Sequence, residues 1–178
     1  MVRYAMRIAA GLIAWAALTG TASAEDAPIE FVSGPFAGVV GQDTVHKETH
    51  LDYGYEKENR ARFAAGPYVG EVQWLKLSGN YYSRDPNAIG RLTRMVEHVF
   101  GVGGSRTVNG DQKSVNGFLA QYRRIEIGIG TSTPKNCAVY YMTRQPDSIY
   151  GYVCGPAGQP VPLDATMSGL SIRNVIGP

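Results

Sequence analysis

The chain has 178 residues and a formal net charge of +2, from 17 lysines and arginines against 15 acidic residues. Arg3 and Arg7 account for this excess, and no basic cluster is larger than Arg123-Arg124. The sequence therefore lacks the basic patch that is typical of nucleic-acid binding, and it lacks a polybasic segment for anionic lipids.

The first 24 residues have the pattern of a cleavable signal peptide. Arg3 and Arg7 precede an uncharged, mostly apolar run over 8–18, and Ala22-Ser23-Ala24 forms a small-residue cleavage pattern. A bilayer-spanning helix needs about 20 apolar residues, so this run is too short for a membrane anchor. We expect an exported protein, periplasmic or secreted, with residues 25–178 as a single extracytoplasmic domain and no integral membrane segment after cleavage.

The N-terminal part of this domain is predicted to form strands. Short apolar runs at 29–32 and 36–40 flank a turn at 33–35. Residues 45–65 are charged and aromatic without a clean period, and they predict a strand followed by a long loop or a short helix. A clearer strand is predicted over 68–77.

An amphipathic helix is predicted next. Asp85 is the expected N-cap, and Pro86 is expected at the first helical position, where its missing N–H costs nothing. Apolar residues then recur at intervals of three and four up to Phe100, and glycines from Gly101 onward end the helix.

The C-terminal half predicts a three-stranded antiparallel meander, from a strand at 118–129 and two further runs at 137–144 and 149–154. The polar segment 105–116 contains Asn-Gly-Asp and predicts a turn or hairpin tip, and 163–176 fits a helix slightly better than a strand. Clustered strands with separated helices predict an α+β fold. The expected architecture is an antiparallel sheet, including this meander, packed on one face by one or two helices.

The two cysteines, Cys137 and Cys154, lie on the last two of these runs. In an exported protein an even pair is expected to be oxidised, and a hairpin centred between Gln145 and Pro146 places the two directly opposite each other. The same register pairs Val139 with Tyr152 and Tyr141 with Tyr150 on the cystine face.

The cystine face is also the candidate recognition surface. If a helix covers the other face of the sheet, this face becomes a semi-exposed aromatic patch, and tyrosine is enriched at contact surfaces. We expect alanine at Tyr141 and Tyr150 to abolish partner capture with little loss of thermal stability. The patch consists of Val139, Tyr141, Tyr150 and Tyr152.

A second candidate site is the sequence His46-Lys47-Glu48-Thr49-His50. Two imidazoles and a carboxylate are suitable ligands for zinc or copper. On a strand all three would project from one face, and on a helix His46 and His50 would be one turn apart, so we expect either arrangement to chelate a metal. The alternative is a solvated polar segment. A complete site would need further ligands, for which the candidates are Asp52, Glu56 and His98.

These features favour a non-catalytic binding or envelope-associated module that contacts a protein, peptide or envelope polymer through the tyrosine-rich sheet face. No nucleic acid and no cofactor are expected, apart from the zinc or copper above. The alternatives are a small secreted hydrolase that uses carboxylates, or His46 and His50 with a metal, and a metal-binding protein built on His46 and His50. The sequence contains no nucleophile motif such as G-x-S-x-G, which leaves the hydrolase without direct support.

Overall fold

The computed structural model of the chain describes residues 29–52, 54–78 and 85–173. The predicted signal peptide lies outside these ranges. Most of the described residues form one antiparallel sheet of seven strands, in the order β2-β3-β4-β8-β7-β6-β5. The strands are β2 (Gln42–Leu51), β3 (Gly54–Ala65), β4 (Tyr68–Leu77), β5 (Ser105–Val115), β6 (Phe118–Ile127), β7 (Lys135–Arg144) and β8 (Asp147–Pro156).

The sheet is built from two meanders, β2–β3–β4 and β5–β6–β7–β8, which join where β4 pairs antiparallel with β8. Helix α1 (Ala88–Val99) connects the two meanders in the chain. The expected α+β class and the antiparallel meander of β6, β7 and β8 are therefore confirmed.

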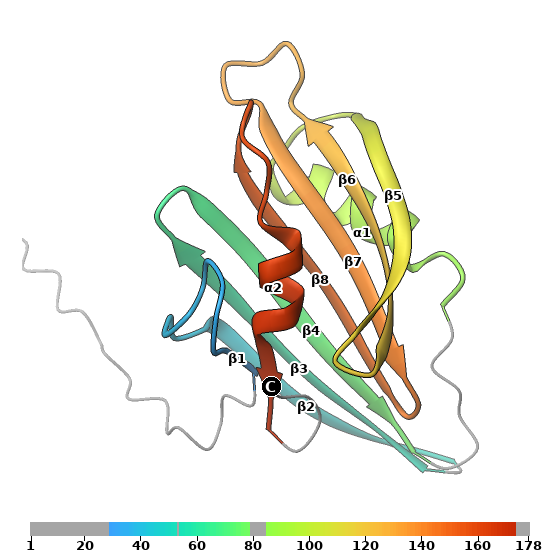
Figure 1. Cartoon of the computed structure of the whole chain (residues 1–178). Coiled ribbons are helices and arrows are strands. Elements are labelled where there is room, and N and C mark those ends of the chain that lie inside the picture. The colour runs from blue at the N-terminus through green and yellow to red at the C-terminus, as the bar shows by residue number, and fades with distance from the viewer. Residues whose placement is uncertain (1–28, 53, 79–84, 174–178) are drawn as a thin grey trace, which may run out of the picture.

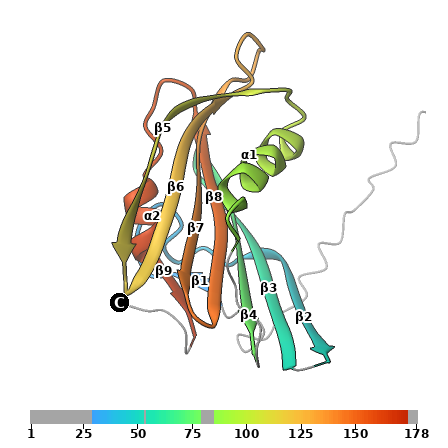
Figure 2. The same cartoon turned by 90° about the vertical axis from the view of Figure 1, so that its right-hand side faces the viewer.

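The two helices lie on opposite faces of the sheet. Helix α1 packs on β6, β7 and β8, and Leu92 and Val96 are buried against that face. Helix α2 (Leu163–Gly169) lies on the other face, together with a two-stranded sheet of β1 (Ile29–Phe31) and β9 (Leu170–Ile172). Figure 1 shows α2 in front of the sheet, and Figure 2 shows α1 and α2 on opposite sides of it.

Each face therefore has its own hydrophobic core. The core under α2 contains Tyr140, Met142 and Ile149 from the central strands, with Leu163 and Met167 from the helix. This helix is also held by charge, because Asp164 forms ion pairs with Lys113 on β5 and Arg124 on β6.

Strands β2 and β3 form a hairpin of two long strands, so the predicted loop or short helix after the first strand was wrong. The sequence of β3 shows no clear alternation of apolar and polar residues, because charged residues occur on both of its faces. Lys57, Asn59 and Phe63 project to the α2 face, whereas Glu58 and Arg60 project to the α1 face. Only towards Phe63 does the usual alternation of apolar and polar residues emerge.

The segment 105–116 was predicted as a turn, but it forms the edge strand β5, and the turn falls at Asn116-Gly117. Nearly all of β5 is exposed, so its polar composition reflects its position at the sheet edge. An irregularity of register between Thr107 and Asn109 gives this edge a bulge.

The predicted strand at 36–40 is absent from the described structure, where 34–37 form a turn that inserts Phe36 into the core against Phe31 and Phe63. Residues 163–172 fulfil both interpretations of that segment, because α2 ends at Gly169 and β9 follows directly. A Cβ at Gly169 would lie 2.3 Å from the Ser33 carbonyl oxygen, so the close approach of the two backbone segments there requires glycine.

The cystine hairpin has the predicted register. Cys137 pairs with Cys154 and forms the disulfide, with a Cα–Cα distance of 4.0 Å. Val139 is opposite Tyr152, and Tyr141 is opposite Tyr150. A two-residue connection at Gln145-Pro146 sets this register, because only one pairing closes so short a loop.

Candidate functional site

The predicted aromatic patch is largely buried. Val139 is 0 % exposed, and Tyr141 and Tyr152 are each 4 % exposed, because α1 packs on the cystine face. Only Tyr150 is partly exposed. The expectation of a semi-exposed surface assumed that the helix covers the other face, and the position of α1 contradicts it.

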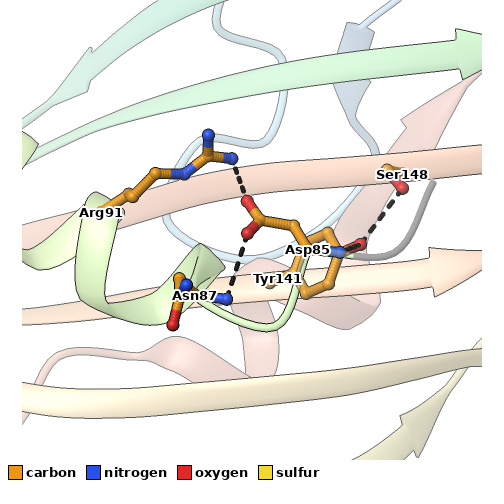
Figure 3. A network of polar contacts seen from close by, with 5 residues as sticks. All are labelled: Asp85, Asn87, Arg91, Tyr141 and Ser148. Carbon is orange, nitrogen blue, oxygen red and sulfur yellow. Dashed lines mark hydrogen bonds and ion pairs between the residues drawn. The ribbon is translucent and has the colours of Figure 1, made fainter.

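Tyr141 instead holds the start of α1 against the sheet. Its hydroxyl accepts a hydrogen bond from the Asp85 backbone N–H at 3.3 Å and lies 3.5 Å from the Ser148 hydroxyl (Figure 3). The Asp85 carboxylate accepts from the Asn87 backbone N–H and pairs with Arg91. Asp85 thus stabilises the turn before the helix. The N-cap is Asn87 and the first helical residue is Ala88, each two residues later than the predicted positions at Asp85 and Pro86.

A groove remains between α1 and the strands β4 and β8. It has a volume of about 300 Å³. Its floor is apolar, and its polar lining comes from one residue each of β4, β8 and α1. The residues that line it are Gln73, Leu75, Ala88, Arg91, Leu92, Met95 and Tyr150.

Charged side chains of β3 and β4 lie beyond this groove on the same face of the sheet. Glu71 is 4 % exposed, and its carboxylate accepts from Arg62 Nε at 2.7 Å and lies 3.5 Å from Arg60 Nε. Gln73 Nε2 donates to Glu58 at 2.9 Å. The buried carboxylate is therefore compensated, and the wall of the groove is fixed by cross-strand contacts.

Tyr152 lies next to Glu71 in the sheet register, and its ring contacts Phe100 edge to face at the C-terminal end of α1. Burial, followed by the negative charge of Glu71, raises the pKa of Tyr152 to about 12, although Arg62 and Arg60 act in the opposite direction. Tyr152 is thus a neutral buried residue at any physiological pH.

A wider and more polar hollow lies on the other side of α1, between the helix and β5 and β6. Its volume is about 710 Å³. Gln112 and Gln121 face each other across the two strands there, and Arg123 lies beside them. Helix α1 therefore divides this face of the sheet into two depressions of different chemistry.

The predicted metal ligands His46, Glu48 and His50 lie at alternate positions of β2 and are all exposed. At about 3.3 Å per residue, His46 and His50 are about 13 Å apart along the strand, too far to bind the same ion. No group of three His, Cys, Asp or Glu side chains suited to one metal occurs among the described residues. The expectation that a single copy could chelate a metal with both histidines is therefore wrong.

The structure also separates two of the three other candidate ligands from these residues, whereas Asp52 lies at the turn that follows β2. His98 is on α1, which packs against β6, β7 and β8. Glu56 is on β3, opposite Thr49, and therefore projects from the α1 face, whereas His46, Glu48 and His50 project from the other. The groove residues Gln73, Leu75 and Met95 were not predicted as a site, because no sequence signal shows which strand lies beside α1.

None of the helices in the described ranges is both long and apolar enough to cross a bilayer. No protein-family model matches the sequence, and no curated protein is similar to it. Among solved structures, the chain is similar to PA94, a protein of unknown function from Pseudomonas aeruginosa described as a candidate regulator. The TM-score is 0.32 at 11 % identity, over 67 % of this chain and 85 % of PA94. This likeness is too low to support an argument about fold family or function.

Proposed function

We propose that this protein is an exported, non-catalytic binding module, periplasmic or secreted, and that its recognition surface is the groove between α1 and the strands β4 and β8. The observation that carries the proposal is the composition of this groove. Leu75, Leu92 and Met95 give it an apolar floor, while Gln73 and Arg91 lie at its polar margin. Binding sites commonly combine an apolar depression with a few polar groups.

The partner we propose is a polypeptide that inserts one or two apolar side chains. A volume of about 300 Å³ is at the lower end of the range for small-molecule sites, which favours an inserted side chain over a whole ligand. Arg91 and Gln73 already contact Asp85 and Glu58, so they are held in place for a partner. Of the four residues of the predicted aromatic patch, Tyr150 is the one that lines this groove.

Catalysis has less support. The hydrolase alternative relied on His46, His50 and carboxylates, and these histidines border neither of the two depressions beside α1. The buried Glu71 is neutralised by two arginines of β3, which is a structural arrangement rather than that of an acid or base exposed to a substrate.

The test uses site-specific photocross-linking of the protein in the cells that export it. A benzoyl-phenylalanine that replaces Met95 should cross-link a discrete polypeptide, whereas the same residue in place of His98, which is exposed on the same helix, should not. Leu75→Glu should abolish the product because it places a charge in the groove. Leu119→Glu is the matched control, since Leu119 is 50 % exposed and lines neither depression.

Equal cross-linking from both positions of α1, or an unchanged product in Leu75→Glu, would show that the groove is not the recognition surface. The intact mass of the purified protein tests export separately. A chain that begins at Glu25 supports signal cleavage, and a chain that retains residues 1–24 contradicts it.

A further inference from the structure

The edge strand β2 has a symmetric arrangement of ligand-type side chains. His46 and His50 lie two residues on either side of Glu48, so a two-fold axis through Glu48 would exchange the two histidine positions. All three side chains are exposed and project from the same face of the strand. The pattern cannot serve one copy of the chain, because the histidines are about 13 Å apart.

The backbone of β2 has the correct polarity for pairing through these same residues. Tyr55 on β3 directs its carbonyl towards β4, where it accepts from the Ser78 N–H at 3.0 Å. The neighbouring residue Glu56 therefore directs its backbone groups to β2, where its partner is Thr49. It follows that His46, Glu48 and His50 direct their N–H and C=O groups outward, away from β3.

We propose that two copies of this chain pair antiparallel along β2 and that Zn²⁺ ions bind between them. With Glu48 opposite Glu48 of the second copy, His46 lies opposite His50 of that copy. Cβ atoms of directly opposed residues are about 5 Å apart, which lets two imidazoles reach one ion. Each dimer has two equivalent sites, and each site has one His46, one His50 and one Glu48 carboxylate, with water in the fourth position.

His46 already has the second contact that a zinc-binding imidazole requires. Its Nδ1 lies 2.6 Å from the side-chain oxygen of Asn59, a residue only 1 % exposed. In the tautomer that donates this hydrogen bond, the lone pair of Nε2 is free for a metal. Such a contact to a fixed oxygen orients the ring and is a regular feature of zinc sites.

Zinc is also what makes the pairing favourable. Without metal, the two Glu48 carboxylates would oppose each other, and like charges directly opposite destabilise a strand pair. Glu48 now pairs with Lys57 at 3.1 Å, and both side chains are more than a third exposed, so this contact contributes little and can be exchanged. The pairing is therefore expected to be metal-dependent.

The first experiment measures mass and zinc content of the purified, disulfide-closed protein by light scattering and native mass spectrometry. We expect a monomer in EDTA and a dimer with one zinc per chain when ZnCl₂ is added. His46→Ala and His50→Ala should each remain monomeric, because either change removes a ligand from both sites. His98→Ala, at an exposed histidine on α1, is the matched control and should still dimerise.

Mixing the two variants that are expected to remain monomeric, His46→Ala and His50→Ala, gives the decisive test. In a pair of one His46→Ala chain and one His50→Ala chain, one site regains both imidazoles and the other loses both. Dimers should therefore reappear, with about half the zinc content of the wild type. A mixture that stays monomeric, a zinc-loaded monomer of the wild type, or zinc dimers that survive in either single variant would overturn the proposal.

Discussion

At the residue scale, Tyr141 shows how one contact changes the meaning of a sequence feature. By composition it belongs to an aromatic patch, but its ring is buried under α1 beside Tyr150, with ring centroids 4.8 Å apart. Its hydroxyl contacts the turn that begins the helix. Tyr141 therefore positions α1, and through α1 it shapes the groove without lining it.

Replacement of Tyr141 should consequently cost stability, contrary to the expectation for an exposed patch. Tyr141→Ala should lower the free energy of unfolding by about 3–5 kcal/mol, as for other large buried aromatic residues. Tyr141→Phe should cost about 1 kcal/mol, because it removes only the hydroxyl contacts. Urea denaturation measures both values, and a loss below about 1 kcal/mol in Tyr141→Ala would show that the ring is not part of the core.

The burial of the adjacent residue, Tyr140, depends on Gly151, its neighbour across the sheet. A Cβ at Gly151 would lie 2.3 Å from the Tyr140 ring, so glycine there makes room for a fully buried tyrosine. Burial raises the pKa of Tyr140, and its hydroxyl has no hydrogen-bond partner within the described residues. Adjacent tyrosines of one strand therefore belong to the two separate cores.

At the scale of elements, α1 acts as a cover over the central strands. It packs on β6, β7 and β8 and leaves β2 and β3 uncovered on the same face (Figure 2). The disulfide and Tyr152 are buried under α1, whereas charged side chains of β3 and β4 form ion pairs beyond it. This division turns one sheet face into a core, two depressions and an ion-pair network. The proposed groove exists because α1 is narrower than the sheet and packs on β6, β7 and β8, which leaves β4 uncovered beside it.

The raised pKa of Tyr152 predicts how this packing responds to alkali. The folded protein retains the phenolic proton to about pH 12, whereas an unfolded tyrosine loses it near pH 10. The contribution of the buried, neutral Tyr152 phenol to the free energy of unfolding is therefore complete below about pH 10, and it is lost as the pH rises from about 10 to 12. Tyr152→Phe should show a weaker decline of unfolding free energy over this interval, measured by urea denaturation. An identical decline in both proteins would contradict the burial of the hydroxyl.

At the scale of the whole molecule, the sheet is protected on both faces only at its centre. Strands β7 and β8 lie between the two cores and pair on both sides, whereas β2 and β5 are edges. In the metal-free monomer, native-state hydrogen exchange should be slowest in β7 and β8 and fastest in β2 and β5, because local opening follows burial and pairing. Exchange of β5 amides as slow as that of β7 would indicate that this edge is covered in solution.

Local chemistry in the sequence was sufficient for several elements. The apolar period predicted α1 nearly to its ends, the strand at 68–77 coincided with β4, and a short turn predicted the pairing of Cys137 with Cys154. Each of these depends on residues that are close in the chain. Where charges occur on both faces, as in β3, or where an edge strand is polar throughout, as in β5, the periodic signal failed.

The sequence by itself determined the α+β class, the helix and the register of the cystine hairpin, because periodicity and turn geometry are local properties. Only the tertiary structure decided which face α1 covers, and therefore that Tyr141 and Tyr152 are core residues. Only the tertiary structure placed His46 and His50 on an extended edge strand, beyond reach of a common ion within one chain. Both outcomes depend on packing between segments far apart in the chain, where the gain in buried apolar area is set by the whole fold.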